Sequence, residues 1–189
     1  MKRFIMLAAL LFISTVSVLF YVNAQELPLA EDLPKKTWKR GLEIAPVQLN
    51  LEGKNRKMVG EGSYLVNAVA GCLDCHTAPT YLEGGDPFLG QAEKINTTNY
   101  MAGGAKFGPF TSANLTPDSK GLPAGLTFDQ FKESVRTGKD FKNRHPQFGP
   151  ILQVFPWPAY SKMTDDDIRN IYEYLRAIPH AEPAPPAAD

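Results

Sequence analysis

The 189-residue chain is poor in cysteine and has no excess of charge of either sign. Its 2 cysteines are too few for a disulfide-rich scaffold or a four-cysteine metal site. Its 20 Lys and Arg residues are balanced by 20 Asp and Glu residues, so the basic surplus typical of nucleic-acid-binding proteins is missing. No segment shows the alternation of a half-buried strand, and no internal repeat is present. These absences favour a mostly α protein with no nucleic-acid partner.

An apolar run at the N-terminus predicts export. Lys2 and Arg3 precede apolar and small residues over 4–22, and Val22-Asn23-Ala24 suits cleavage by a signal peptidase. Uncleaved, residues 4–22 are long enough to anchor the chain in a membrane. We therefore predict a signal peptide over residues 1–24, or alternatively an N-terminal anchor. Both alternatives predict a periplasmic or exported protein, held in the second case at the outer face of the inner membrane.

The remaining chain divides into three segments. Residues 25–57 form a basic, Pro-containing extension without a sustained helical or strand period, interpreted as a solvated tether or as a docking arm for an acidic partner or a membrane surface. Residues 58–179 are predicted to form a single domain, and residues 180–189 a disordered Pro/Ala-rich tail. The domain contains an irregular stretch over 78–126, and the 15 glycines and 16 prolines of the chain favour long loops.

Capping chemistry marks two helices. Thr127 and Gln130 form a capping-box pattern, and Gly138 is placed to end that helix. Thr164 precedes three aspartates, whose negative charge suits a helix N-terminus, and Pro179 ends the second helix. A third helix is expected within residues 58–77. The positions that recur near the helical period are Gly62, Tyr64, Leu65, Ala68, Val69, Phe128, Phe131, Val135, Ile168, Ile171, Tyr172 and Leu175.

Both cysteines lie in one motif, Cys-x-x-Cys-His, formed by Cys72, Cys75 and His76. A thioredoxin-like pair would need a strand–helix pattern around it, and zinc would need ligands beyond the unpaired His145 and His180. A structural disulfide would leave His76 without a role. The motif instead predicts one covalent haem c, with both cysteines forming thioethers and His76 as the proximal iron ligand. We also expect the second ring nitrogen of His76 to donate to a carbonyl or to water.

Residues 58–179 resemble the class I c-type cytochromes, most closely exported bacterial cytochromes and the cytochrome subunits of membrane-bound dehydrogenases. This resemblance implies a first helix that crosses the last one, with Gly62 and Tyr64 meeting Tyr172 and Leu175 around a single haem. The segments that carry the resemblance are Gly62-Ser63-Tyr64-Leu65, Cys72 to His76, Ala102-Gly103-Gly104, Asn114-Leu115-Thr116-Pro117-Asp118, Gly121-Leu122, Phe128 to Gly138, Pro156-Trp157 and Tyr172 to Pro179.

The sequence departs from this family at the sixth iron ligand. A methionine normally precedes the Pro-Trp pair, but Phe155 stands at that position and cannot coordinate iron. Met163, His145 and Met101 are candidates to replace it. Two further hypotheses stay open: no protein side chain binds the iron on that side, or this loop aligns differently with the family.

Other side chains are expected around the haem. Asn114, Thr116 and Arg144 are candidates to bind its propionates. The aromatic residues expected to shield it are Phe107, Phe110, Phe148, Phe155, Trp157 and Tyr160.

The residues favour an electron carrier or an electron-transfer subunit over an enzyme. No combination of acid, base and nucleophile stands out, and a haem supplies its own redox chemistry. We expect a mono-haem c-type cytochrome that transfers single electrons in the periplasm to or from a redox protein: a dehydrogenase, an oxidase or another cytochrome. The alternative is a five-coordinate haem protein that binds a small gas or reacts with peroxide, because Phe155 replaces the expected methionine.

Overall fold

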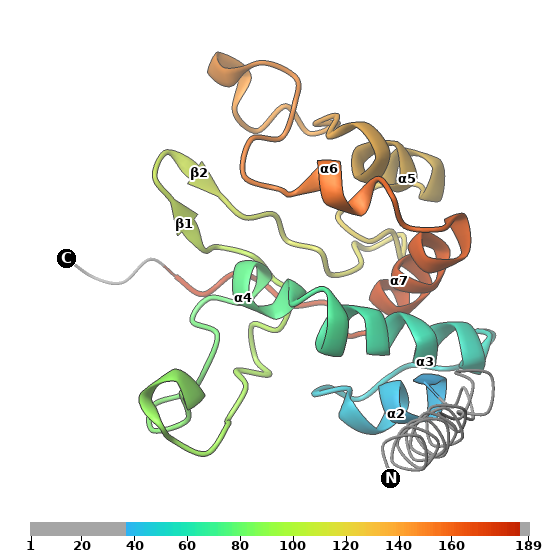
Figure 1. Cartoon of the computed structure of the whole chain (residues 1–189), viewed down its shortest axis with the longest axis vertical. Helices are drawn as coiled ribbons and strands as arrows, with labels where there is room; N and C mark the ends of the chain where they lie inside the picture. Colours follow the sequence, from blue (N-terminus) through green and yellow to red (C-terminus); the bar gives the residue numbers. More distant parts are fainter. Residues whose placement is uncertain (1–36, 186–189) are drawn as a thin grey trace, which may run out of the picture. The chain divides into compact units, whose positions relative to one another are not determined.

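A computed structural model describes residues 37–185 (Figure 1). The predicted signal peptide or anchor, with its apolar run over 4–22, lies outside the described residues. The part that is described is mostly helical, which confirms the predicted fold class. Its elements are α2 Thr37–Ile44, α3 Arg56–Tyr64, the π-helix η1 Leu65–Val69, α4 Cys72–His76, the 3-10 turn η2 Pro87–Leu89, β1 Lys106–Phe107, β2 Phe110–Thr111, α5 Phe128–Thr137, the 3-10 turn η3 Pro146–Phe148, α6 Trp157–Tyr160 and α7 Asp165–Ala177. Over residues 37–185, no helix has the length and apolar character needed to cross a membrane.

Helix α2 was missed by the sequence analysis, which interpreted residues 25–57 as a solvated tether. It packs against α3 through glycines: a Cβ atom on Gly41 would lie 1.9 Å from the Gly60 carbonyl oxygen. The hydroxyl of Ser63, which is buried, donates to the carbonyl oxygen of Gly41 over 2.6 Å. This helix of 8 residues is therefore held by contact with α3.

The first long helix crosses the last one at Gly62, as predicted, but the residues that Gly62 meets on α7 differ from those predicted. A Cβ atom on Gly62 of α3 would lie 1.9 Å from the carbonyl oxygen of Asn170 and 2.8 Å from the Cβ of Tyr174, both on α7. The predicted partner Tyr172 faces α5 instead, where its ring centroid lies 5.4 Å from that of Phe131. One face of α7 therefore packs on α3 and another packs on α5.

The single helix expected within residues 58–77 is divided into three pieces. Helix α3 continues as the π-helix η1, and Gly71 then adopts a left-handed conformation with φ of 59°. This break starts a new short helix, α4, at Cys72. The change of helix type next to the cysteines resembles the π segments that often occur at functional sites.

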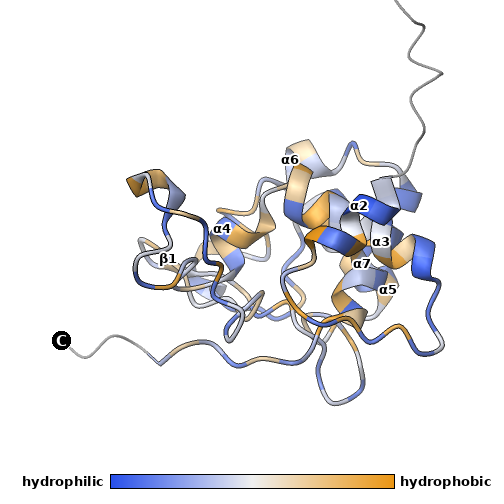
Figure 2. Ribbon diagram, turned by 90° about the horizontal axis from the view of Figure 1, so that it is seen from below, coloured by the Kyte–Doolittle hydropathy of each residue, from blue (hydrophilic) through white to orange (hydrophobic). Residues whose placement is uncertain are grey.

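The two capped helices form as predicted. The hydroxyl of Thr127 accepts the Gln130 backbone N–H, and the hydroxyl of Thr164 accepts the Asp167 backbone N–H. Gly138 ends α5 in the left-handed conformation. Helices α3, α5 and α7 enclose the apolar core. Hydrophobic segments lie near α6 and α7 and also at α4 (Figure 2).

The start of the C-terminal tail, for which the sequence predicts disorder, is hydrogen-bonded to the domain. The amide of Asn99 donates to the Glu182 carbonyl over 2.8 Å, and the amide of Asn114 donates to the Ala181 carbonyl over 2.8 Å. The described tail therefore runs along the irregular 78–126 stretch. Residues 186–189 lie outside the described part of the chain.

Candidate functional site

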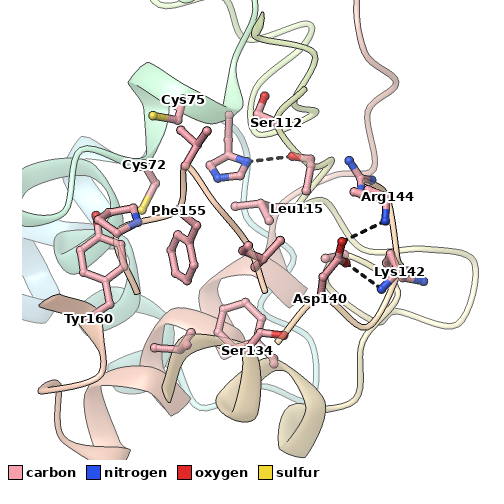
Figure 3. Close-up of a pocket in the computed structure, with 18 of the residues that line it drawn as sticks. Cys72, Cys75, Ser112, Leu115, Ser134, Asp140, Lys142, Arg144, Phe155 and Tyr160 are labelled. Carbon is pink, nitrogen blue, oxygen red and sulfur yellow. Dashed lines mark hydrogen bonds between the residues drawn. The ribbon is translucent and has the colours of Figure 1, made fainter. Parts of the chain in front are cut away.

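An apolar cavity of about 270 Å³ lies between two walls of the domain (Figure 3). One wall comes from the end of η1, from α4 and from the loop around residues 107–115. The other comes from α5, from the segment 139–163 and from α7. The apolar and aromatic side chains that line it include Val66, Phe107, Phe110, Leu115, Leu126, Phe131, Val135, Phe141, Ile151, Leu152, Val154, Phe155, Tyr160, Met163, Ile168, Ile171 and Leu175.

The structure brings Cys72, Cys75 and His76 together in the first wall of this cavity. Neither of these two cysteines is part of a disulfide. Burial, together with the nearby Cys75, raises the pKa of Cys72 to about 12. Burial, together with the charge of Asp74, also raises the pKa of Cys75. Both sulfurs are therefore protonated and uncharged at neutral pH, as an apolar wall requires.

His76 is held in one tautomer by the backbone. Its Nδ1 lies 2.7 Å from the carbonyl oxygen of Ala113, and a carbonyl can only accept, so Nδ1 donates. Burial lowers the pKa of His76, outweighing the opposite effect of the Ala113 hydrogen bond. The ring is therefore neutral at pH 7, with the lone pair on Nε2, which is the form that binds metals.

The loop carrying Ala113 is attached directly to the motif. The backbone N–H of Gly103 donates to the His76 carbonyl over 2.7 Å, and that of Met101 donates to the hydroxyl of Thr77 over 3.0 Å. Gly103 also touches Ala113, because a Cβ atom at position 103 would lie 2.5 Å from the carbonyl carbon of Ala113. Only a glycine therefore lets this loop approach both His76 and Ala113.

The structure places two of the three candidates for the sixth iron ligand at the cavity and the third away from it. Phe155, Met163 and His145 line the cavity. Met101 is fully buried in the core and is not among the cavity-lining residues. Its backbone conformation is left-handed, with φ of 58°. Met101 lies in the irregular stretch 78–126, where no sequence period indicates which side chains are buried.

The expected aromatic shield is found in part. Phe107, Phe110, Phe155 and Tyr160 line the cavity. Phe148 and Trp157 do not: the ring of Phe148 packs on Phe110, and that of Trp157 covers Gly138. Phe131 and Phe141 complete the lining, although the sequence analysis did not assign them to the shield.

Of the three candidate propionate ligands, only Arg144 lines the cavity. The side chain of Asn114 instead accepts the backbone N–H of Thr116 over 2.8 Å and donates to the Ala181 carbonyl. The hydroxyl of Thr116 donates to the same Asn114 oxygen over 2.7 Å. The side chains of Asn114 and Thr116 therefore bind each other and the start of the C-terminal tail, not the cavity. Cationic groups at the cavity are instead Lys139, Lys142 and Arg144.

The cavity residues fit a covalently bound haem. Two thiols and a neutral imidazole face one apolar space, and the free Nε2 of His76 matches the requirement of an axial ligand. Across residues 37–185, no group of three or more His, Cys, Asp or Glu side chains is arranged to hold a metal ion by itself.

Comparisons with known proteins agree with this donor set, although no family model matches the chain. It is 28% identical over 123 residues to the gluconate 2-dehydrogenase cytochrome c subunit of Pantoea cypripedii, covering 64% of this chain and 23% of that protein. It is 24% identical over 148 residues to the cytochrome c subunit of the quinone alcohol dehydrogenase of Gluconobacter oxydans (strain 621H), covering 75% of this chain and 27% of that protein. It is 28% identical over 134 residues to the fructose dehydrogenase cytochrome subunit of Gluconobacter japonicus, covering 69% of this chain and 23% of that protein.

The chain spans about a quarter of the length of these relatives. The similarity nevertheless confirms the resemblance inferred from the motifs: the chain is similar to the cytochrome c subunits of dehydrogenases.

Proposed function

We propose that this chain is a mono-haem c-type cytochrome that transfers single electrons as a carrier or as an electron-transfer subunit. The convergence of Cys72, Cys75 and His76 on one apolar cavity carries the proposal. The chain's own groups need no acid–base or nucleophilic step, because the haem supplies the one-electron chemistry when it is bound.

The motif residues and Ala113 have defined tasks in this proposal. Cys72 and Cys75 hold the haem covalently, and Nε2 of His76 ligates its iron. Ala113 keeps the imidazole in the metal-binding tautomer by accepting the Nδ1 proton. The apolar walls exclude water, which favours burial of the porphyrin at roughly 25 cal/mol per Å² of apolar surface.

The partner in this proposal is another redox protein. Ile151 and Val154 line the cavity and are also exposed, at 39% and 43%, so the cavity mouth offers an apolar contact surface. Such exposed apolar groups are typical of interaction sites. The names of the relatives support a dehydrogenase as the partner, with an oxidase or another cytochrome as alternatives.

The proposed location is the periplasm, with residues 1–24 as the signal and 4–22 as an anchor if the signal is not cleaved. Covalent haem attachment and the apolar N-terminal run support it. N-terminal sequencing of the protein from a periplasmic fraction tests this location. A mature chain starting at Gln25 is expected for a cleaved signal, and an intact N-terminus in the membrane fraction for an anchor. Recovery only from the cytoplasm would contradict both.

The haem proposal is tested by expression together with a c-type haem attachment system. We expect an added mass of one haem that survives denaturation, and a redox titration with a single one-electron step. The double variant Cys72→Ala/Cys75→Ala should lose the covalent haem, while Asp74→Ala, inside the same motif, should keep it. A wild-type chain without covalent haem, or with a mass of two haems, would contradict the proposal.

A further inference from the structure

The cavity offers few side chains that could complete the coordination of a haem iron. Protein ligands to haem iron are His, Cys, Met and Tyr. Apart from Cys72, Cys75 and His76, the lining residues of these types are His145, Tyr160 and Met163. Each of them is constrained by contacts of its own.

His145 lies in the segment 139–163, opposite the wall that carries His76, but its ring contacts residues of that first wall. Its Nε2 lies 3.5 Å from the backbone N–H of Thr111, which donates to it, and its ring packs edge-on against Phe110 at 5.1 Å. Thr111 is in the same loop as Ala113, which holds His76. The Nε2 of His145 is therefore engaged with the loop that holds His76 and is not free to bind iron.

Tyr160 uses its hydroxyl to join the two walls. The hydroxyl donates to the carbonyl oxygen of Ala70 over 2.9 Å, next to the cysteine motif. Its ring packs against Phe155, with the two centroids 5.3 Å apart. The oxygen of Tyr160 is therefore engaged with the backbone, and Phe155 is the side chain that covers this part of the cavity. Figure 3 shows Phe155 projecting into the cavity close to Cys72 and Tyr160.

Met163 is fixed at the start of α7. Arg136 of α5 donates to the carbonyl oxygen of Met163 over 2.6 Å and to the carboxylate of Asp165 over 2.7 Å. Thr164, the next residue, caps the helix. The side chain of Met163 also packs against the apolar core. Iron ligation by Met163 would require its side chain to give up this packing while its backbone stays fixed.

From these contacts we propose that Phe155 leaves the sixth coordination position of the bound haem without a protein ligand, so that the site takes a small neutral diatomic molecule such as carbon monoxide. The proposal rests on the proposed function, because it requires the haem. Phe155 presents only a hydrocarbon ring, which cannot donate electrons to iron but leaves an apolar space beside it.

The two hydroxyls of this wall are already hydrogen-bonded to backbone carbonyls. The hydroxyl of Tyr160 is bound to Ala70, and the hydroxyl of Ser134 donates to the Lys139 carbonyl over 2.8 Å. A ligand beside Phe155 would therefore find no free hydroxyl to bind, and carbon monoxide needs none. Binding of carbon monoxide forms one bond, from the carbon lone pair to ferrous iron, with no change in oxidation state. An apolar distal side favours such binding over O–O cleavage.

The test uses the haem-loaded protein reduced with dithionite and titrated with carbon monoxide. The wild-type spectrum should be high-spin before the titration, and it should convert to a sharp, saturable carbon monoxide spectrum. Phe155→Met places a thioether at the same position and should give a low-spin spectrum without the gas. It should also weaken carbon monoxide binding by about tenfold or more, because the sulfur must first be displaced.

Three further variants serve as controls for the assignment of the sixth ligand. Phe155→Leu keeps an apolar side chain and should stay high-spin and gas-binding, even if Phe155→Met fails to load haem. Met163→Ala and His145→Ala should leave the wild-type spectrum unchanged. A low-spin ferrous wild type would overturn the proposal, and its loss in one of these two variants would identify the true ligand. That result would leave the proposed function intact, since covalent haem and a one-electron step would still be found.

Discussion

Gly62 on α3 lies directly against Asn170 on α7, so closely that a Cβ atom at position 62 would sit 1.9 Å from the Asn170 carbonyl oxygen. No real side chain tolerates that separation, so the crossing of the two helices depends on glycine. Helix α3 leads through η1 into α4, which carries Cys72 and His76. The same crossing therefore sets where the haem-binding motif lies relative to the opposite wall.

Gly62→Ala is expected to lower the free energy of unfolding by about 1–3 kcal/mol, because α3 and α7 must separate to make room. Urea denaturation of the haem-loaded protein measures the change. Ala68→Ser adds a heavy atom to an exposed position in η1 and should change stability by less than about 0.5 kcal/mol. Equal stability of Gly62→Ala and wild type would contradict the close crossing.

Gly103→Ala is expected to disturb the loop that holds His76. Gly103 has φ of 77°, and the Cβ atom of an alanine at this position would lie 2.5 Å from the Ala113 carbonyl carbon. Gly108 offers a matched control, with φ of 59° and nothing within 4 Å of its Cβ position. Gly108→Ala should cost only the strain of the left-handed backbone, about 1–2 kcal/mol.

The difference between the two variants isolates the contact with Ala113. Gly103→Ala should add an overpacking cost of about 1–3 kcal/mol to the backbone strain. It should also change the near-ultraviolet and visible circular dichroism of the haem, which reports the orientation of the His76 ring. Identical stability and identical haem spectra in both variants would show that this loop does not position His76.

The capped helices could be predicted from the sequence because capping is local chemistry. Thr127 with Gln130, and Thr164 with the following aspartates, satisfy backbone N–H groups within the same turn. Such signals need no knowledge of the rest of the fold. The haem-binding motif could be predicted for the same reason, since Cys72, Cys75 and His76 are close in the chain.

The missed features depend on contacts between residues far apart in the chain. Helix α2 is held by Gly41 against Gly60, and the start of the tail is held by the side chains of Asn99 and Asn114. The acceptor for His76 is a backbone carbonyl 37 residues away, at Ala113, and a carbonyl leaves no residue-type signal. The sequence alone does not identify the sixth ligand, because Met101 and His145 lie in irregular loops whose position in space has no sequence pattern.

Tyr174→Phe is expected to destabilise the protein by about 1–3 kcal/mol, because it removes a shared hydrogen-bond partner from a buried cluster. The hydroxyls of Tyr174 and Tyr100 lie 2.8 Å apart, and the amide of Asn67 donates to Tyr174 over 3.1 Å. Burial raises the pKa of both tyrosines, so both remain protonated and available as donors. Thermal unfolding of the variant measures the loss.

A double-mutant cycle with Tyr100→Phe separates this cluster from general packing. The double variant should lose less stability than the sum of the single variants, by about 0.5 kcal/mol or more, because the two hydroxyls share one network. Tyr81→Phe removes a hydroxyl from a less buried ring and should have little effect. Strict additivity of Tyr100→Phe and Tyr174→Phe would argue against a coupled network.

The attachment of the tail is expected to weaken as pH rises. The Nε2 of His180 lies 2.8 Å from the Glu182 carboxylate, and its Nδ1 lies 2.9 Å from the Pro117 carbonyl. The hydrogen bond to Glu182 raises the pKa of His180 against the opposing effect of desolvation, and the Pro117 carbonyl and the charge of Asp118 add to the increase. A raised pKa means that the folded state binds the proton more tightly than the unfolded chain does. The stabilisation is therefore complete below the ordinary histidine pKa of about 6.5 and is lost as pH rises through the raised pKa.

Glu182→Gln tests this pH dependence, because it removes the carboxylate and keeps the size of the side chain. The thermal midpoint of the wild type should exceed that of the variant below about pH 6.5, and the difference should disappear at alkaline pH. Glu133→Gln is the matched control, because Glu133 pairs with Lys139 over 2.9 Å and has no histidine partner. Its effect should stay constant over the same pH range. A Glu182→Gln effect that is equally independent of pH would show that the His180 proton does not hold the tail.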